Sequence, residues 1–430
     1  MPNQLAAKGG TPVRTKPFIS WPIIGDEERK LLLEVYDSGV WAFGGPREAE
    51  FALKFAAFCG AQEALCVANG SISLELALRA LGVGPGDEVI VPGLTWLATA
   101  WAAVQVGATP VFADIREVDW CLDPEDVRRK ITPRTKALIP VHLYNQCAEM
   151  DELAAIAQKH SLAIVEDCAH AHGSQWNGRG IGTLGHIGSF SFQQSKAMTS
   201  GEGGVLTTNN SALAQKIYGL KNCGRPWPKT GQCGFGGNYR ITELQAALLL
   251  PQLARFESQL KTKTANIAIF REKISKVPGI KLTPPKSKVT RQGLYGVSLN
   301  YDPDAFAGMT QDILVSALKA EGIPAQVPYS PVYLSPLWTP GRDLVRCEPG
   351  VKPEDRLGLK SKCLVTERVA NETGIVILHH IFMGPPEDMD DIANAFAKVQ
   401  ANAGELRMDI LQKKAKGAVR GILSKVGIGV

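Results

Sequence analysis

Lys196 lies in the segment SFQQSKAMTSGEGG (191–204), between an apolar run and a glycine-rich turn. Lysine side chains usually lie on the solvated surface of a protein. Burial disfavours the ammonium form and lowers the pKa, so a lysine delivered to an apolar site becomes a neutral amine. A neutral amine can attack an aldehyde, and this position therefore predicts a covalent nucleophile. The alternative is an ordinary surface lysine that follows a strand.

A second candidate follows another apolar run. The segment AIVEDCAHAHG (163–173) ends its apolar part at Glu166 and Asp167. A carboxylate at the end of a buried strand requires a partner, because an unpaired buried charge is costly. A protonated pyridine nitrogen would serve, and Asp167 would keep that ring cationic and able to accept electrons. The alternatives are a helix N-cap and an ion pair with a nearby basic side chain.

A third pattern is a strand that runs through Asn-Gly-Ser into a helix, in VANGSISLELAL (67–78). The free N–H groups and the positive dipole end of a helix N-terminus favour a phosphate. Gly70 would permit close backbone approach, and the hydroxyl of Ser71 would add a donor. An ordinary strand-to-helix turn with a serine cap is the alternative.

Trp96 follows another predicted strand, in PGLTWLATA (92–100), where its ring could stack on a planar ligand. A core tryptophan is the alternative. Together the four segments would supply a nucleophile, a partner for a ring nitrogen, a phosphate cradle and a stacking face. This combination predicts a site for pyridoxal 5′-phosphate (PLP) and is more specific than any one segment.

Seven apolar runs must position these residues. Most are continuous rather than alternating, which is typical of strands covered on both faces in a mainly parallel sheet. The sequence therefore predicts an α/β fold, whose ligands bind beyond the carboxyl ends of the strands. The runs are residues 64–69, 88–93, 110–115, 137–144, 162–169, 187–193 and 203–209.

The pattern along the chain predicts a division into domains. We expect a large domain over 46–275 and a smaller α+β domain over 276–403, which the N-terminal segment 1–45 joins. The clearest helix is ELQAALLLPQLARFESQL (243–260). In the tail, 404–430, apolar residues recur at helical spacing beside basic ones. We expect this tail to pack on its own subunit or to fray, with membrane contact as the alternative.

The composition excludes several other classes of protein. The 430 residues carry a net charge of +5, which is mild for this length, and no nucleic-acid-binding pattern accompanies it. The nine cysteines show no C-x-x-C spacing, so no metal site is expected. The N-terminus lacks the features of a signal peptide, and the longest apolar stretch is too short to span a bilayer. We expect a cytoplasmic enzyme.

Five segments in order resemble the DegT/StrS family of PLP-dependent sugar and cyclitol aminotransferases, which have fold type I. The resemblance extends from GGTPVRTKP to about residue 400 and implies a large domain with a seven-stranded type of sheet. The segments are NGSISLELALRALGVGPGDEVIVPGLTWLATA, PVHLY, IVEDCAHAHG, GSFSFQQSKAMTSGEGG and GNYRITELQAA.

The resemblance implies a role for individual residues. Lys196 matches the Schiff-base lysine and Asp167 the partner of the pyridine nitrogen. His170 matches a position that contacts the ring hydroxyl, and Trp96 matches the stacking aromatic. Asn238 matches an asparagine that reaches the phosphate in the other subunit, so the family implies a homodimer with shared active sites. The expected phosphate-binding residues are Gly70, Ser71 and Ser191, and Ile72 is a further expected cofactor-binding residue.

Some positions depart from the family pattern. Ser71 stands where threonine is usual, which retains the hydroxyl. Asn145 and Cys147 replace a common glycine and a common proline, and neither change removes a catalytic group. The tail beyond residue 404 lies outside the resemblance.

Two segments are similar to one subgroup. FQQSK (192–196) and NETGIVILHHIFMG (371–384) resemble the members that aminate keto-inositols such as scyllo-inosose with L-glutamine. The function that we expect is transfer of an amino group from L-glutamine or L-glutamate to such a cyclic ketone, in natural-product biosynthesis. Candidate substrate-binding residues are His379, His380, Tyr239 and Arg240; a buried histidine with satisfied partners is the alternative for His379 and His380.

Other functions stay open at this point. A 3-amino-5-hydroxybenzoate synthase would use the same lysine for an elimination that aromatises the ring. A nucleotide-linked keto-sugar is another possible acceptor. A non-catalytic PLP-binding regulator would be expected to lose Lys196, Asp167 or the phosphate cradle, and the sequence retains all three.

Overall fold

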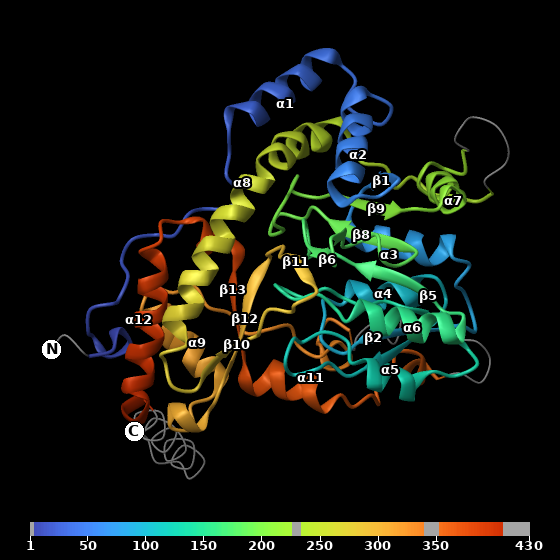
Figure 1. Ribbon diagram of the computed structural model, residues 1–430. Helices are drawn as coiled ribbons and strands as arrows, with labels where there is room; N and C mark the ends of the chain where they lie inside the picture. Colours follow the sequence, from blue (N-terminus) through green and yellow to red (C-terminus); the bar gives the residue numbers. More distant parts are fainter. Residues whose placement is uncertain (1–3, 226–233, 339–351, 407–430) are drawn as a thin grey trace, which may run out of the picture.

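The computed structural model describes residues 4–225, 234–338 and 352–406, and the apolar stripe predicted for the tail lies outside this part. Figure 1 shows an α/β fold built on a seven-stranded sheet. In spatial order the strands are β1 (Glu63–Val67), β9 (Gly204–Thr208), β8 (Ile187–Ser191), β5 (Ala163–Asp167), β4 (Thr135–Leu138), β2 (Glu88–Pro92) and β3 (Thr109–Ala113). Only β9 runs antiparallel to its neighbours in this sheet, which confirms the prediction of a mainly parallel sheet.

Both faces of this sheet are buried. Neighbouring residues on one strand enter different cores: Ile90 packs on one side of β2, and Val89 and Val91 pack on the other. Helices α2 (Pro46–Cys59), α5 (Pro124–Lys130) and α6 (Met150–His160) contribute to the first core. Helices α3 (Gly70–Ala80), α4 (Ala98–Gln105) and α7 (Ser211–Lys221) contribute to the second. This arrangement explains the continuous apolar runs in the sequence.

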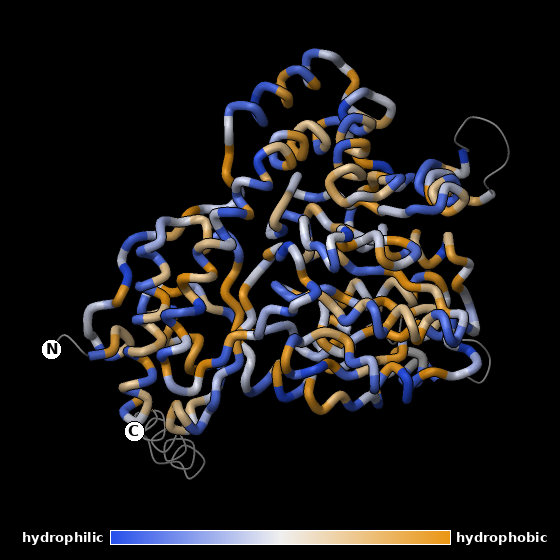
Figure 2. Tube along the Cα trace, viewed as in Figure 1, coloured by the Kyte–Doolittle hydropathy of each residue, from blue (hydrophilic) through white to orange (hydrophobic). Residues whose placement is uncertain are grey.

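A smaller antiparallel sheet lies beside the first in Figure 1. Its strands are β10 (Ile280–Leu282), β12 (Gly296–Tyr301) and β13 (Gly374–Leu378), with β12 in the centre. Helices α9 (Gln311–Ala320) and α12 (Asp388–Ala401) share a third hydrophobic core with it. In Figure 2, hydrophobic segments run through the interior of both parts. The remaining elements include β6 (Gln175–Trp176), β7 (Arg179–Gly180), β11 (Val289–Arg291), α10 (Pro353–Arg356) and α11 (Leu364–Arg368).

One long helix, α8 (Glu243–Ile274), connects the two parts of the molecule. Thr242 and Gln245 form a capping box at its start. The helix contacts α1 (Asp26–Ser38) and α2 near its beginning and α12 beyond. It extends 14 residues past the predicted segment, which ended at Leu260. The domain boundaries that we expected stay a prediction.

The fourth predicted strand is shorter than expected. The apolar run 137–144 predicted a strand throughout, but β4 ends at Leu138. Pro140 has no N–H to donate, although its carbonyl still accepts from the N–H of Asp167 at 2.9 Å. The backbone of Tyr144 then adopts φ 54°, which ends any extended conformation. The segment becomes a loop at the carboxyl edge of the sheet, where it forms part of the site.

In the described part of the chain, no helix combines the length and apolar character needed to cross a membrane.

Candidate active site

A cavity of about 900 Å³ opens at the carboxyl edge of the large sheet. It brings together eight of the nine residues that the sequence predicted to bind the cofactor. They are Gly70, Ser71, Ile72, Trp96, Asp167, His170, Ser191 and Lys196. Because the strands are parallel, the loops that follow β1, β2, β5 and β8 meet at this edge.

Lys196 lies in the loop between β8 and β9, and its side chain is 9% exposed. Its backbone N–H donates to the carbonyl of Gln193 at 2.8 Å, which forms a turn directly after the strand. The Nζ atom lies 4.5 Å from the ring centroid of Tyr295. Burial lowers the pKa of Lys196 to about 8, and the carboxylate of Asp167 opposes that shift. The amine can therefore lose its proton near neutral pH, as a nucleophile requires.

Asp167 is the last residue of β5 and is buried. The hydroxyl of Thr99 donates to its Oδ2 at 2.8 Å, and the N–H of Ala169 donates to its Oδ1 at 3.2 Å. Burial raises the pKa of Asp167, and these two hydrogen bonds oppose the rise. A carboxyl group in this environment gains from a cationic N–H partner, which is what a protonated pyridine ring offers.

The phosphate cradle predicted from Asn-Gly-Ser is the N-terminus of α3. Asn69 is the N-cap, and its side chain accepts the N–H of Ile72 at 2.9 Å. The amide of Ile72 is therefore occupied, which leaves the amides of Gly70 and Ser71 in the first turn for a ligand. A Cβ on Gly70 would lie 2.7 Å from the Cβ of Ser191, so only glycine permits this close approach.

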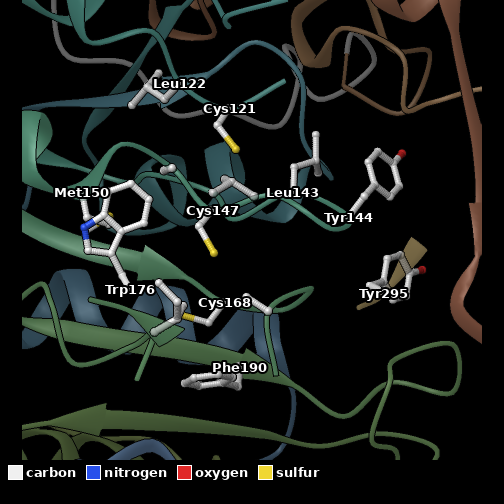
Figure 3. Close-up of a cluster of buried hydrophobic side chains, with 14 of the residues drawn as sticks. Cys121, Leu122, Leu143, Tyr144, Cys147, Met150, Cys168, Trp176, Phe190 and Tyr295 are labelled. Atoms are coloured by element: carbon white, nitrogen blue, oxygen red, sulfur yellow. The ribbon is translucent and has the colours of Figure 1, made fainter. Parts of the chain in front are cut away.

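A wall of stacked rings forms another side of the cavity. The ring of His170 stacks on Tyr295 with centroids 3.8 Å apart, and Tyr144 lies beside both rings. Figure 3 shows Tyr144 and Tyr295 facing each other at one side of a buried hydrophobic cluster. Trp96 is 48% exposed and contacts Tyr329, so its ring is open to a ligand on the cavity side.

His170 has a defined tautomer. The N–H of Tyr144 donates to Nδ1 at 3.2 Å, so the ring proton lies on Nε2, which faces the hydroxyl of Tyr329 at 3.3 Å. Burial holds the pKa of His170 well below its usual range, and the charge of Lys196 adds to this effect. The imidazole is therefore neutral and presents an N–H donor.

Three candidates from GNYR are not part of the lining of this cavity in the same chain. Asn238 is exposed and forms a bridge with Asn222. The backbone of Tyr239 pairs with Lys221, and the guanidinium of Arg240 donates to Asn222 at 3.0 Å. None of the three belongs to the described lining of the cavity.

The two histidines near the C-terminus have different surroundings. His379 is fully buried, and both ring nitrogens have partners at 3.1 Å, Nζ of Lys263 and the carbonyl of Ser195. This position matches the alternative of a buried histidine with satisfied partners. His380 is partly buried and packs edge-on against His379. A substrate contact for either histidine stays a prediction.

Several lining residues were missed in the sequence. Thr99 is the second residue of α4, and Trp96 precedes that helix; a threonine in the first turn of a helix gives no distinctive signal in the sequence. Tyr295 directly precedes β12, the central strand of the smaller sheet, and Tyr329 follows α9. Both are far in sequence from the other motifs of the site. Their arrival at the site depends on long-range packing, for which the sequence gives no local signal.

Three buried side chains at β5 and in the loop after β4 are of types that can bind a metal. His142, Glu166 and Cys168 have potential ligand atoms within 4.8 Å of one another, and all three are buried. The carboxylate of Glu166 already accepts three backbone N–H groups and faces Nε2 of His142 at 3.2 Å. These partners satisfy the carboxylate, so the group is a structural hydrogen-bond network.

Comparison with known proteins identifies the family. The family model described as the DegT/DnrJ/EryC1/StrS aminotransferase family matches residues 22–346. A putative L-glutamine:3-amino-2,3-dideoxy-scyllo-inosose aminotransferase from Streptoalloteichus tenebrarius is 40% identical over 95% of this chain and all of its own length. An L-glutamine:2-deoxy-scyllo-inosose aminotransferase from the same organism is 38% identical, with the same coverage of both chains.

A solved structure supports the same assignment. The crystal structure of 3-amino-5-hydroxybenzoic acid synthase superposes with a TM-score of 0.80 and 30% identity, over 90% of this chain and all of that chain. The fold class and the family predicted from the sequence are thus confirmed. The chain belongs to the DegT/DnrJ/EryC1/StrS aminotransferase family and is an aminotransferase of the class that depends on PLP.

Proposed function

We propose that this protein transfers the amino group of L-glutamine to a cyclic ketone of the scyllo-inosose type, with PLP as cofactor. The convergence of Lys196, Asp167 and the N-terminus of α3 on one cavity carries this proposal. The relatives described above support the choice of donor and acceptor, since their names specify L-glutamine and a scyllo-inosose derivative.

The residues of the cavity fit the cofactor. The amides of Gly70 and Ser71 and the hydroxyl of Ser191 would hold the phosphate, in a space that a Cβ on Gly70 would fill. Trp96 and the facing wall of stacked rings would hold the planar ring between them. When bound, PLP supplies an aldehyde carbon that receives the amino group and a protonated ring that accepts electrons from the substrate.

Lys196 would act twice. Its neutral Nζ would form the covalent bond to the cofactor's aldehyde carbon, whose oxygen would leave as water, because burial already lowers the pKa of this amine to about 8. Once the donor has displaced it, the freed amine would remove a proton from the donor Cα and deliver it to C4′ of the cofactor. The same amine would move the proton in the opposite direction when the ketone is aminated.

Asp167 and His170 would set the electronic state of the ring. Asp167 would accept the ring N–H, and Thr99 and the N–H of Ala169 hold its carboxylate in place for this contact. His170 would donate its Nε2 proton to the ring hydroxyl in place of the Tyr329 hydroxyl, since Nδ1 is occupied by the N–H of Tyr144. These two contacts would keep the ring protonated and fixed in orientation.

We further infer that the active enzyme is a homodimer in the cytoplasm, with Asn238 contributing to the partner's phosphate site. Asn238 is exposed and lies near Phe235, whose side chain is 98% exposed. An exposed large aromatic side chain beside a predicted ligand-binding residue favours burial against a second subunit. The cofactor residues of one chain would then be completed by the other.

A second candidate function is the synthesis of an aromatic amine, which is supported by the structural similarity to the 3-amino-5-hydroxybenzoic acid synthase. An enzyme of that kind would form an aromatic amine by elimination instead of transferring an amino group between two substrates. The product distinguishes the two functions, because only the aromatic amine absorbs in the near ultraviolet.

The test is turnover with purified protein, PLP, L-glutamine and one ketone at a time. We expect an aminocyclitol product by mass spectrometry with scyllo-inosose, 2-deoxy-scyllo-inosose or 3-amino-2,3-dideoxy-scyllo-inosose. Lys196→Ala is the control, and it should lose turnover while the cradle can still bind PLP. Turnover of only a nucleotide-linked keto-sugar, or normal turnover by Lys196→Ala, would contradict the proposal.

A further inference from the structure

The two carbonyl groups that precede Lys196 are both held by distant side chains. The indole N–H of Trp21 donates to the carbonyl of Gln194 at 3.1 Å. The Nε2 atom of His379 lies 3.1 Å from the carbonyl of Ser195. Ser195 and Lys196 share a peptide bond, so the second contact acts on the backbone of the predicted nucleophile itself.

The two donors also support each other. The rings of Trp21 and His379 meet edge to face with centroids 4.5 Å apart. Trp21 comes from the N-terminal segment before α1, and His379 follows β13 of the smaller sheet. Parts of the chain that are more than 350 residues apart in sequence thus converge on the loop that carries Lys196.

Lys263 of α8 lies behind this pair and is 1% exposed. Its Nζ lies 3.1 Å from Nδ1 of His379 and 5.5 Å from the centroid of Trp21. Burial alone lowers the pKa of Lys263 to about 7. Among the described residues no carboxylate forms an ion pair with it, so His379 and the indole ring are its polar support.

The hydrogen-bond directions are fixed by chemistry. A backbone carbonyl can only accept, so Nε2 of His379 carries the ring proton that is donated to Ser195. Nδ1 of the neutral ring is then an acceptor, and Nζ of Lys263 is the donor to it. Burial holds the pKa of His379 well below its usual range, and the charge of Lys263 adds to this effect, consistent with the neutral ring.

We propose that Trp21, His379 and Lys263 form a clamp that positions the Lys196 loop against the cofactor site. Trp21 and His379 are positioning residues because they hold the carbonyls of Gln194 and Ser195, and Lys263 acts through His379 by fixing its tautomer and ring orientation. A displacement of about 1 Å can slow a positioned reaction by about 100-fold. This inference rests on the proposed role of Lys196 in holding the cofactor.

The matched variants follow from the contacts. His379→Gln keeps a side-chain amide that can donate to Ser195 and accept from Lys263, whereas His379→Leu loses both contacts. Lys263→Met keeps an unbranched side chain that is one atom shorter, and it removes the donor. Trp21→Phe keeps an aromatic ring at this half-buried position but removes the N–H that donates to Gln194, together with the five-membered ring of the indole. Lys261→Met, at an exposed position of the same helix, is the control.

Two measurements are made on the PLP-loaded proteins. The first is the visible circular dichroism per bound cofactor before any substrate is added, since it reports how rigidly the lysine-bound chromophore is oriented. The second is the single-turnover rate constant with L-glutamine. We expect His379→Leu and Lys263→Met to lose most of the dichroism and to react 10-fold to 100-fold more slowly, about the effect of a lost hydrogen bond plus misplacement.

The remaining variants show whether the three residues position the Lys196 loop or only stabilise the fold. Trp21→Phe should share the defect to a smaller degree, and His379→Gln should restore both signals relative to His379→Leu. Unchanged dichroism and rate in folded Lys263→Met and Trp21→Phe, with only the thermal midpoint lowered, would overturn the clamp. If Lys263→Met does not fold, the dichroism and rate of Trp21→Phe, His379→Leu and His379→Gln test the clamp.

The two proposals fail in different ways. If His379 instead binds the acceptor, His379→Leu should raise the KM for the ketone, while Lys263→Met and the cofactor dichroism stay unchanged; this result would also overturn the clamp. A wild-type protein that binds PLP but does not react with amino donors would contradict the proposed function. The dichroism of the variants would still test the clamp in that case.

Discussion

Lys196 and Asp167 line one cavity, and burial shifts each pKa in the direction that favours the neutral form of the group. It lowers the pKa of Lys196 to about 8 and raises the pKa of Asp167. The neutral amine is ready to react with an aldehyde. The carboxyl group, in contrast, requires the cation that a protonated ring would bring, so the site is complementary to the cofactor in two places.

The pKa of Lys196 predicts how the cofactor-free protein takes up PLP. Only the neutral amine attacks, so the rate of covalent attachment should rise with pH through about 8 and level off above it, well below the value near 10.5 for a free lysine. The appearance of the visible absorption band at a series of pH values measures this rate.

Asp167→Asn provides the control for that pH profile. The carboxylate opposes the effect of burial on Lys196, so its removal should move the midpoint to lower pH. A wild-type midpoint near 10, or a midpoint that rises in Asp167→Asn, would contradict the described environment of Lys196.

His172 makes a prediction about stability. The side chain is buried against Phe190 and Phe192, and its ring nitrogens have no hydrogen-bond partner among the described residues. Burial lowers its pKa to about 3, from 6.5. Between these pH values the unfolded chain binds the extra proton, so stability falls as the pH decreases through this window, by at most about 1.4 kcal/mol per pH unit from this group.

Urea unfolding of the cofactor-free protein at pH 7.5, 6.5 and 5.5 measures this effect. His172→Leu should show a shallower loss of stability below pH 6.5 than the wild type, because the leucine has no proton to gain. His160→Gln, an exposed position on α6, should keep the wild-type slope. Equal slopes in the wild type and His172→Leu would show that His172 is already accessible to protons.

Much of the candidate site could be predicted from individual residue types at unusual positions. Lys196 and Asp167 could be found because a lysine or a carboxylate is unusual at the end of an apolar run. Thr99 and Tyr295 could not, since a threonine in a helix and a tyrosine near a strand are common. Their roles arise from the hydrogen bond to Asp167 and from the ring stack with His170, which only the folded chain creates.

At the scale of elements, the N-terminus of α3 is the most constrained part of the site. A Cβ on Gly70 would lie 2.7 Å from Ser191, so Gly70→Ala must move the helix or the serine. We expect PLP affinity to fall about 10-fold to 100-fold, because hydrogen bonds to a charged phosphate would lengthen. Equilibrium titration of cofactor-free protein with PLP measures the change.

Gly84→Ala is the matched control for that substitution. A Cβ there would meet its nearest neighbour, the carbonyl of Val106, at 3.9 Å, which is ordinary contact. Its PLP affinity should equal that of the wild type. If Gly70→Ala also binds normally, the phosphate does not lie at this helix end.

The loop after β4 lies in a segment for which the sequence predicted a longer strand than the structure has. Apolar character alone predicted a strand through Tyr144, but the missing N–H of Pro140 and the positive φ of Tyr144 end it earlier. The strands without an internal proline, such as β5 and β8, were predicted within two residues of their ends. Pro92 and Pro110 lie at the ends of their apolar runs, and β2 and β3 keep nearly the predicted length, whereas Pro140 lies in the middle of its run and accompanies the early end of β4.

At the scale of the whole molecule, the mainly parallel sheet followed from continuous apolar runs, which need cover on both faces. The extension of α8 to Ile274 and the convergence of Trp21 and His379 on one loop did not follow. Contacts between segments far apart in sequence depend on how the two parts of the molecule pack. No local pattern encodes that packing.

The proposed homodimer makes a prediction that requires two chains. Lys196→Ala lacks the nucleophile, and Asn238→Ala should hold PLP weakly because its partner's phosphate site is incomplete. When the two variants are unfolded and refolded together, half of the dimers are mixed, and each mixed dimer contains one intact site. The mixture should recover about a quarter of wild-type activity at limiting PLP.

The same variants refolded separately and then combined without exchange are the control, and they should stay near the activity of Asn238→Ala alone. No gain on co-refolding, with mixed dimers present by mass spectrometry, would show that Asn238 acts within its own subunit or not at all.

The central claim is that the protein moves the amino group of L-glutamine to the cofactor, with Lys196 as the residue that transfers the proton. The most direct test is the visible absorption spectrum of the PLP-loaded protein before and after addition of L-glutamine, with no ketone present. The account predicts a yellow protein whose visible band is lost on addition of the donor and returns when a scyllo-inosose-type ketone is added. A yellow protein whose spectrum does not respond to L-glutamine, L-glutamate or L-alanine would contradict it.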